Sequence, residues 1–295
     1  MPDAGSRSSV PSDLDELTAA VLGAAKYRAV CADTVRRIGE RELARGRGLK
    51  EAIKATKSRL HQVFGAFGPP PDYERLLREL ESAYASGSQD AIRSACRAAL
   101  ASHASTRERL PILDRFYAEV FAVTGKPTRI LDLACGLHPL GLPWMGLPSD
   151  AVYTAFDIDG RAVEFLNRYF AIAGIAGRAV HADILCRTPD EPADVAFLLK
   201  TLPGLERQEK GAAHRVLAAL EARHIVVSFP VASLGGREKG MRGNYERAFL
   251  EMTVCKPWRV ERLAFPTELV FVVNISSRLT PRQRGSSFTE VSSFD

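Results

Sequence analysis

Short apolar runs alternate with helical stretches from about residue 128 onward. Five runs, at residues 129–134, 152–159, 179–185, 194–199 and 224–229, are separated by segments such as 161–174 and 209–222, which have helical periodicity. A repeated strand, helix and strand pattern predicts a parallel sheet covered by helices on both faces. Two further runs, at 258–265 and 268–276, are separated only by Pro266 and Thr267, which predicts a closing antiparallel hairpin.

The N-terminal part of the chain follows another pattern. Across residues 13–122 apolar side chains recur at steps of three, four and seven, as at Leu49, Ile53 and Leu60, which is typical of helices. A mostly parallel sheet that ends in an antiparallel pair is the layout of class I methyltransferases. We therefore expect an α/β, class I (Rossmann-like) S-adenosylmethionine-dependent methyltransferase fold with a helical N-terminal domain. The expected boundaries are 1–105 for the helical domain, 106–276 for the methyltransferase domain and 277–295 for a disordered tail.

Composition excludes several classes of protein. Hydrophobic residues make up 46% of the chain and charged residues 25%, the balance of an ordinary globular protein. No window approaches the roughly 18 uncharged apolar residues of a membrane span, and the polar start has no secretory h-region, so a cytoplasmic protein without a membrane partner is expected. The five cysteines never form a CxxC pair and the six histidines form no ligand cluster, so we expect no disulfide framework and no metal.

Positive charge is concentrated near the N-terminus. The whole chain carries +5, whereas residues 21–60 alone hold eleven Lys or Arg against four Asp or Glu. Arg47, Lys50, Lys54 and Lys57 lie at steps of three, four and three, so they share one face of a helix. A basic stripe of this kind indicates a polyanionic partner, and the alternative is a solvated helix face.

Candidate binding residues follow the predicted strands. In a doubly wound sheet ligands lie at the carboxyl ends of the strands. Gly136 follows the first run, Asp157 ends the second run 21 residues later, and Asp183 follows the third. His138 stands where a dinucleotide-binding GxGxxG motif needs its second glycine, which disfavours NAD. A glycine turn and two acids in this order favour S-adenosylmethionine; the alternative is that both acids are caps or turn residues. No basic side chain stands at a spacing from Cys135 that would indicate a catalytic nucleophile. Cys135 is therefore expected to pack beneath the loop.

Six strings of the sequence resemble one family. They are LHQVFGAF (60–67), HASTRERLPILDRFYA (103–118), DLACGLHPLGLPWMG (132–146), AFDID (155–159), FLLKTLP (197–203) and SFPVASLGGREKGMRGNYE (228–246). They resemble the aminoglycoside-resistance 16S rRNA methyltransferases, which modify N7 of guanine 1405 in the decoding site. The resemblance runs from about Lys26 to Asn274.

The resemblance implies a set of cofactor contacts. Arg109 would bind the methionine carboxylate, Asp157 the ribose, and Asp183 with its neighbour the adenine. Without the resemblance, Ser105 or Thr106 would be interpreted as a helix cap and Arg109 as a partner of Glu108 or Asp114. The full expected set is Phe64, His103, Ser105, Thr106, Arg109, Ala134, Gly136, Asp157, Asp183, Ile184, Leu199 and Gln208.

The resemblance also implies contacts with RNA. Residues of the SLGGREKGM loop, together with Tyr245 shortly after it, would hold the target base. The helical domain would dock on rRNA. The alternative for this loop is a mobile basic surface loop, and the role of Lys200, beside the same cleft, is left open. The residues expected at the base are Arg237, Lys239, Met241 and Tyr245. The residues expected to dock on rRNA are Lys26, Arg47, Lys50, Lys54, Lys57 and Arg59.

The reaction implied by the resemblance needs no general base, because guanine N7 carries a lone pair and no proton. We expect S-adenosylmethionine as cofactor, 16S rRNA in the 30S subunit as partner, a monomer, and aminoglycoside resistance as the consequence. Two alternatives stay open: a methyltransferase for another rRNA nucleotide, and a non-catalytic RNA-binding protein.

Overall fold

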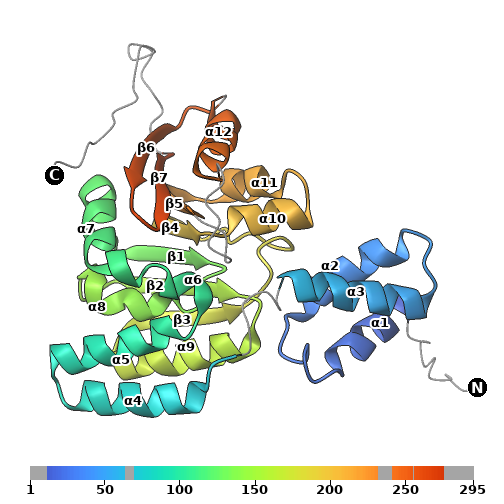
Figure 1. The fold of residues 1–295 in the computed structure, drawn as a ribbon, viewed down its shortest axis with the longest axis horizontal. Coiled ribbons are helices and arrows are strands. Elements are labelled where there is room, and N and C mark those ends of the chain that lie inside the picture. The colour runs from blue at the N-terminus through green and yellow to red at the C-terminus, as the bar shows by residue number, and fades with distance from the viewer. Residues whose placement is uncertain (1–11, 64–69, 232–240, 255, 276–295) are drawn as a thin grey trace, which may run out of the picture. The chain divides into compact units, whose positions relative to one another are not determined.

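The computed structural model describes residues 12–63, 70–231, 241–254 and 256–275, without the side chains of residues 241 and 242. The chain divides into two compact units, Met1–Ala66 and Phe67–Asp295 (Figure 1).

The first unit contains three helices around a core of their own. They are α1 (Asp13–Leu22), α2 (Ala32–Leu43) and α3 (Leu49–Val63). Ser12 begins α1, where its hydroxyl accepts the Asp15 backbone N–H at 3.3 Å. The core includes Leu17, Val35 and Leu60, all fully buried, so the apolar stripes of the three helices face one another.

The second unit is built on a seven-stranded sheet in the order β3-β2-β1-β4-β5-β7-β6. The strands are β1 (Arg129–Leu133), β2 (Val152–Asp157), β3 (Ala176–His181), β4 (Ala193–Leu199), β5 (Ala222–Pro230), β6 (Arg259–Ala264) and β7 (Glu268–Asn274). The first five are parallel, and β7 pairs antiparallel with both β5 and β6. Each apolar run in the sequence therefore contributes to a strand, although the run at 179–185 extends past the end of β3 at His181, and the predicted hairpin is confirmed.

Helices cover both faces of this sheet. One core joins the sheet to the helices α4, α5, α7, α8 and α9, and a second core joins its other face to α10, α11 and α12 (Figure 1). Neighbouring residues of a strand enter opposite cores, as Ile130 and Leu131 do. No helix of the described segments is long and apolar enough to cross a membrane. The helical elements are α4 (Tyr73–Ala85), α5 (Gln89–Ala101), α6 (Ala104–Arg107), η2 (Leu110–Ile112), α7 (Leu113–Thr124), η3 (His138–Gly141), α8 (Leu142–Met145), α9 (Gly160–Ala173), α10 (Leu202–Gln208), α11 (Ala212–Ala219) and α12 (Met241–Thr253).

The division between the units differs from the predicted boundary. Internal contacts separate the chain at residues 66 and 67, whereas the sequence placed the boundary at 105 and 106. The reason is the burial of α4 and α5: Leu77, Leu80 and Leu100 are nearly inaccessible and belong to the same core as the sheet. Helical periodicity shows that a segment is helical but not which core receives its apolar face. The expected tail, 277–295, lies outside the described residues.

Candidate functional site

The carboxyl ends of β1, β2 and β3 meet at one edge of the sheet. The Cys135 N–H after β1 donates to the Phe156 carbonyl at 3.0 Å, and the Ala182 N–H after β3 donates to the Asp157 carbonyl at 3.0 Å. The end of β2 is therefore hydrogen-bonded to the loop after β1 on one side and to the loop after β3 on the other. This brings together the segments that carry Gly136, Asp157 and Asp183, as the sequence predicted.

Asp157 is held in one orientation by two backbone donors. Its Oδ2 accepts the Gly136 N–H at 2.8 Å and its Oδ1 accepts the Asp159 N–H at 2.9 Å. Burial raises the pKa of Asp157, and the N–H groups of Asp159 and Gly136 oppose that rise because they stabilise the charged form. Each carboxylate oxygen retains lone-pair capacity, so the group can accept two neighbouring hydroxyls, as a ribose presents them.

The loop after β1 brings its backbone close to the segment that includes His103. Ala134 and Gly136 have φ values of +52°, and a Cβ on Gly136 would lie 3.2 Å from Cε1 of His103. Glycine is favoured at position 136 by its positive φ together with this close approach, whereas a positive φ alone accommodates an alanine at position 134. His103 Nδ1 lies 3.0 Å from the Ser105 hydroxyl, and burial lowers the pKa of His103. The structure thus brings His103, Ser105 and Gly136 together.

The far side of the predicted cofactor site is partly buried. Asp183 is 4% exposed, and its Oδ1 accepts the Leu185 N–H at 2.8 Å. Ile184 is buried, Leu199 ends β4 half-buried, and the Gln208 amide donates to the Gly204 carbonyl at 3.3 Å. Phe64 lies outside the described residues. The contacts of all these residues with a cofactor stay a prediction.

Thr106 and Arg109 are integrated into the protein interior. Thr106 is buried, and its hydroxyl donates to the carbonyls of Leu100, in the last turn of α5, and His103 at 2.6 and 3.1 Å; the residue at the N-cap of α6 is His103. Arg109 is 3% exposed, and its Nη2 lies 3.0 Å from Oε2 of Glu268. Neither Glu108 nor Asp114, the alternatives considered from the sequence, is its partner among the ion pairs of the described residues; binding of a carboxylate by Arg109 stays a prediction.

Glu268, at the start of β7, is the centre of a buried ion network that sequence reasoning missed. Its Oε1 lies 3.2 Å from Lys200 Nζ, which also donates to Glu108 at 2.6 Å and to the Ser105 carbonyl at 2.9 Å. Burial alone would raise the pKa of Glu268, but the charges of Arg109 and Lys200 outweigh it and hold that pKa below its ordinary value. A single Glu at the start of a strand carries no sequence signal for this role.

Lys200 adopts an unusual backbone conformation at this network. Its φ is +58°, in the left-handed region that non-glycine residues rarely occupy. The backbone N–H of Lys200 donates to the Ser228 carbonyl at 2.9 Å, and its side chain joins the segment that includes Ser105 and Glu108. The network therefore ties the end of β4 and the start of β7 to the segment that holds His103.

His138 and Cys135 have structural positions beneath the loop. His138 Nδ1 lies 2.9 Å from Oδ2 of Asp132, which also accepts the Tyr153 hydroxyl at 2.8 Å, and both His138 and Asp132 are nearly inaccessible. Cys135 is 5% exposed and burial raises the pKa of its thiol, which confirms the predicted packing role. No group of three His, Cys, Asp or Glu side chains in the described segments could hold a metal ion.

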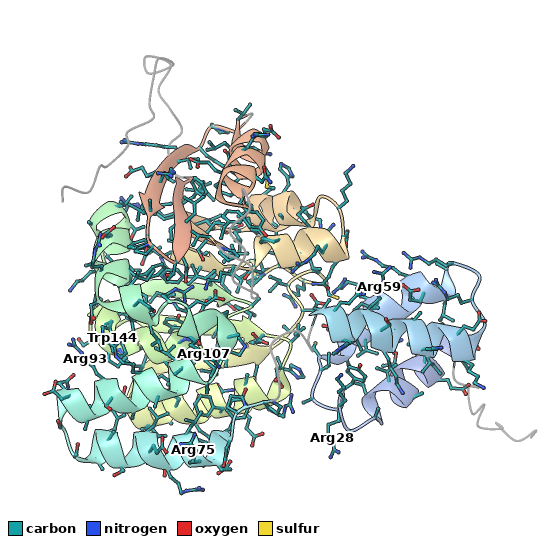
Figure 2. All side chains as sticks on the ribbon, in the orientation of Figure 1. Arg28, Arg59, Arg75, Arg93, Arg107 and Trp144 are labelled. Carbon is teal, nitrogen blue, oxygen red and sulfur yellow. The ribbon has the colours of Figure 1, made fainter. Side chains whose placement is uncertain are left out.

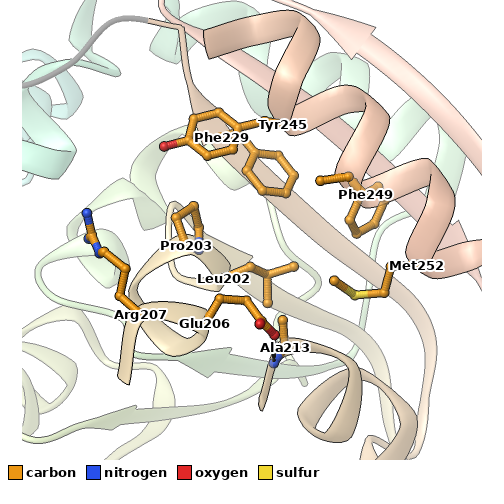
Figure 3. Close-up of a pocket in the computed structure, with 10 residues that line it drawn as sticks. Leu202, Pro203, Glu206, Arg207, Ala213, Phe229, Tyr245, Phe249 and Met252 are labelled. Carbon is orange, nitrogen blue, oxygen red and sulfur yellow. Dashed lines mark hydrogen bonds between the residues drawn. The ribbon is translucent and has the colours of Figure 1, made fainter. Parts of the chain in front are cut away.

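An apolar cavity of about 300 Å³ lies between α10, β5 and α12 (Figure 3). Its wall includes the rings of Tyr245 and Phe229, which stack with centroids 5.2 Å apart, together with Leu202 and Pro203. Of the residues predicted at the target base, Tyr245 thus lines this cavity and Met241 begins α12. Arg237 and Lys239 lie outside the described residues, so the structure does not test their role.

The basic residues predicted to dock on RNA belong to the first unit. Lys50 and Lys54 are exposed on α3, and Lys57 is half-buried on the same helix. Lys26 is exposed, with its Nζ 3.0 Å from Nδ1 of His61. Arg47 and Arg59 both pair with the buried carboxylate of Glu42. The predicted helix is confirmed for Lys50, Lys54 and Lys57, but the prediction is wrong for Arg47, which lies between α2 and α3. The sequence did not predict the buried partner.

Comparison with solved structures defines the class of protein. The 16S rRNA methyltransferase RmtF in complex with S-adenosyl-L-homocysteine is 37% identical, with a TM-score of 0.76 over 90% of this chain and 99% of that one. The 16S rRNA methylase RmtB is 31% identical, with a TM-score of 0.73 over 90% and 99%. With its strand order and the site at the strand ends, the protein is a class I, S-adenosylmethionine-dependent methyltransferase.

Sequence comparison then defines the family. The model described as "Ribosomal RNA methyltransferase (FmrO)" matches residues 23–272. The 16S rRNA (guanine(1405)-N(7))-methyltransferase of Micromonospora echinospora is 43% identical over 270 residues, which are 90% of this chain and 98% of the relative. The enzyme of the same name from Serratia marcescens is 35% identical over 88% and 98%. The chain belongs to the FmrO family of ribosomal RNA methyltransferases.

Proposed function

We propose that this protein transfers a methyl group from S-adenosylmethionine to N7 of guanine 1405 in 16S rRNA within the 30S subunit. The proposal rests on the hydrogen bonds that connect the carboxyl ends of β1, β2 and β3. The Gly136 N–H donates to the Asp157 carboxylate, and the Ala182 N–H, next to Asp183, donates to the Asp157 carbonyl. The target nucleotide is that of the relatives from Micromonospora and Serratia.

The residues at the strand ends fit the cofactor. The loop at Ala134 and Gly136 exposes its backbone, because both residues have positive φ and a Cβ on Gly136 would press on His103. Asp157 would hold the ribose hydroxyls, Asp183 the adenine amino group, and residues of the His103–Arg109 segment the methionine end. When bound, the cofactor supplies a methyl group already activated by its sulfonium.

The protein's contribution to the reaction is then orientation. Guanine N7 has an in-plane lone pair and no proton, so no side chain has to act as a base. Both carboxylates at the strand ends already accept backbone N–H groups, which suits a binding role. Catalysis consists of holding N7 in line with the methyl group at about 3 to 3.5 Å.

The Glu268 network would position the methionine end of the site. Lys200 donates to the Ser105 carbonyl and contacts Glu268, which in turn holds Arg109. Three segments far apart in the sequence are thereby fixed to one another at the edge of the sheet. We infer that the network keeps the His103–Arg109 segment in place for the cofactor rather than taking part in methyl transfer.

The target base must leave its helix to react. Side chains cannot read the deep, narrow major groove of RNA, where N7 lies, and extruding a base costs a few kcal/mol. Docking of the basic first unit on rRNA phosphates would offset that cost. The residues proposed at the base are Arg237, Lys239, Met241 and Tyr245.

Resistance follows from the product. A methyl group and a positive charge on guanine 1405 would repel an aminoglycoside ammonium group bound at the decoding site. We further propose that the protein acts in the cytoplasm as a monomer, with the small ribosomal subunit as its partner.

The test is methyl transfer to purified 30S subunits from labelled S-adenosylmethionine. Borohydride reduction and aniline cleavage, which act at N7-methylguanine, then locate the modified nucleotide by primer extension, with Asp157→Ala as the inactive control. Label at nucleotide 1405 is expected. Label at another nucleotide would favour a different rRNA target, and failure to bind S-adenosylhomocysteine would favour a non-catalytic RNA-binding protein.

A further inference from the structure

Glu42 is a buried carboxylate in the first unit that contacts three arginines. It lies in the last turn of α2 with its side chain only 4% exposed. Arg45 Nη1 lies 2.7 Å from its Oε1, Arg47 Nη1 donates to its Oε2, and Arg59 Nε lies 3.8 Å from its Oε1. Arg45 and Arg47 follow α2, and Arg59 belongs to α3. We call these three residues the arginine cradle.

The guanidinium groups of the cradle are at the surface although their shared partner is not. The side chains of Arg45, Arg47 and Arg59 are 51%, 36% and 52% exposed. Three cations around one carboxylate leave a local charge of +2, and each guanidinium has five N–H donors. Glu42 accepts one hydrogen bond from Arg45 and one from Arg47, and Arg59 pairs with it through charge while donating to Gln62 at 3.4 Å. Figure 2 shows Arg59 on the outside of α3. Surface donors held in fixed positions are suited to the oxygens of a phosphate.

We propose that the arginine cradle binds a phosphodiester group of the rRNA backbone, and that Glu42 is the positioning residue that orders its three guanidinium groups. The inference rests on the proposed function and deepens it. A free surface arginine loses side-chain entropy when it binds phosphate, whereas an arginine already held by Glu42 has lost much of that freedom before RNA arrives.

The sign of one mutational effect separates this role from simple electrostatics. Glu42 is an anion within a basic surface, so if only net charge mattered, its neutralisation would tighten binding to a polyanion. If Glu42 orders the cradle, its neutralisation frees the three arginines and weakens binding. Glu42→Gln keeps the shape of the side chain while removing the charge.

The matched control is Glu40→Gln, an exposed glutamate two residues earlier on α2 with the same change in charge. The measurement is the Kd for 30S subunits by filter binding at several salt concentrations, with the Kd for S-adenosylhomocysteine and the thermal midpoint of each variant. We expect Glu42→Gln to bind 30S subunits about tenfold more weakly, equivalent to one charge-assisted hydrogen bond, with a shallower salt dependence. Glu40→Gln should bind as tightly as wild type or tighter, and S-adenosylhomocysteine binding should not change in either.

A second set of variants tests the arginines themselves. Arg47→Ala should weaken 30S binding in the wild-type background and have much less effect in the Glu42→Gln background, because the cradle is already disordered there. Arg45→Lys and Arg59→Lys keep the charge but lose the planar fork, so each should weaken binding even if Glu42→Gln fails to fold.

Several outcomes would overturn the inference. They are Glu42→Gln binding as tightly as wild type or tighter, equal losses from Arg47→Ala in both backgrounds, or full affinity of the lysine variants. In those cases wild-type protein that still methylates 30S subunits leaves the proposed function standing. Wild-type protein that does not bind 30S subunits would overturn both.

Discussion

Replacing Gly136 by alanine perturbs the loop after β1 in two ways. The φ of Gly136 is +52°, so an alanine there incurs about 1 kcal/mol of backbone strain. The new Cβ would also lie 3.2 Å from Cε1 of His103, closer than an ordinary van der Waals contact, so the ring or the loop must move by a few tenths of an ångström.

The displacement reaches the ribose site directly. The Gly136 N–H donates to Oδ2 of Asp157 at 2.8 Å, so a shifted loop also shifts or loses that hydrogen bond. The backbone strain is present in both the free and the bound protein and does not change the affinity, whereas the weakened hydrogen bond to the ribose-binding carboxylate costs about 2 kcal/mol. Expressed as affinity, this is about a 30-fold increase in the Kd of S-adenosylhomocysteine.

Gly87 provides the matched control. Its φ is +68°, yet a Cβ there would meet no atom within 4 Å, and it lies between α4 and α5, away from the strand ends. Gly87→Ala should therefore lower the free energy of unfolding by about 1 kcal/mol in urea titrations, and Gly136→Ala should lower it by at least as much. Only Gly136→Ala should weaken S-adenosylhomocysteine binding by calorimetry. Wild-type affinity in Gly136→Ala, or an equal loss in Gly87→Ala, would refute the reasoning.

Three further predictions follow. Asp157→Ala should abolish S-adenosylhomocysteine binding, whereas Lys54→Ala with Lys57→Ala should preserve it and weaken 30S binding with a shallower salt dependence; equal loss of cofactor affinity in both would contradict this division. Glu268→Gln should lower the free energy of unfolding by about 3 kcal/mol at pH 7, because two buried cations lose their counter-ion. Since the folded pKa of Glu268 is lowered, its stabilisation is complete above the unfolded value of 4.5 and declines as pH falls below it; a difference between wild type and variant that does not shrink in acid would argue against the network. Phe249→Ala, at a site 1% exposed, should cost about 3 to 5 kcal/mol in urea titrations without changing S-adenosylhomocysteine affinity if its packing role is only structural.

The candidate site divides into residues that periodicity could find and residues that it could not. Gly136, Asp157 and Asp183 follow apolar runs, and parallel strands necessarily present those positions at one edge of the sheet. Glu268 and Arg109 are 159 residues apart and meet only because β7 joins the sheet beside β5. No local pattern in the sequence predicts this contact between Arg109 and Glu268.

The boundary between the units shows the same limit. The segments that form α4 and α5 have the same helical periodicity as those of the first unit, and the sequence analysis grouped them with it. Their leucines instead belong to the core of the sheet. Periodicity depends on the distance between neighbouring residues of one helix, whereas membership of a core depends on which other surface that helix meets.

For this protein the sequence alone determined the order of strands and helices, the antiparallel hairpin at the end of the sheet, and the positions of the acids at the strand tips. These features depend on near-neighbour spacing and on the geometry that all parallel sheets share. The tertiary structure decided the partners of the buried charges: Glu268 with Arg109 and Lys200, and Glu42 with its arginines. A buried charge needs opposite charges or hydrogen-bond donors beside it, and the fold alone determines which residues supply them.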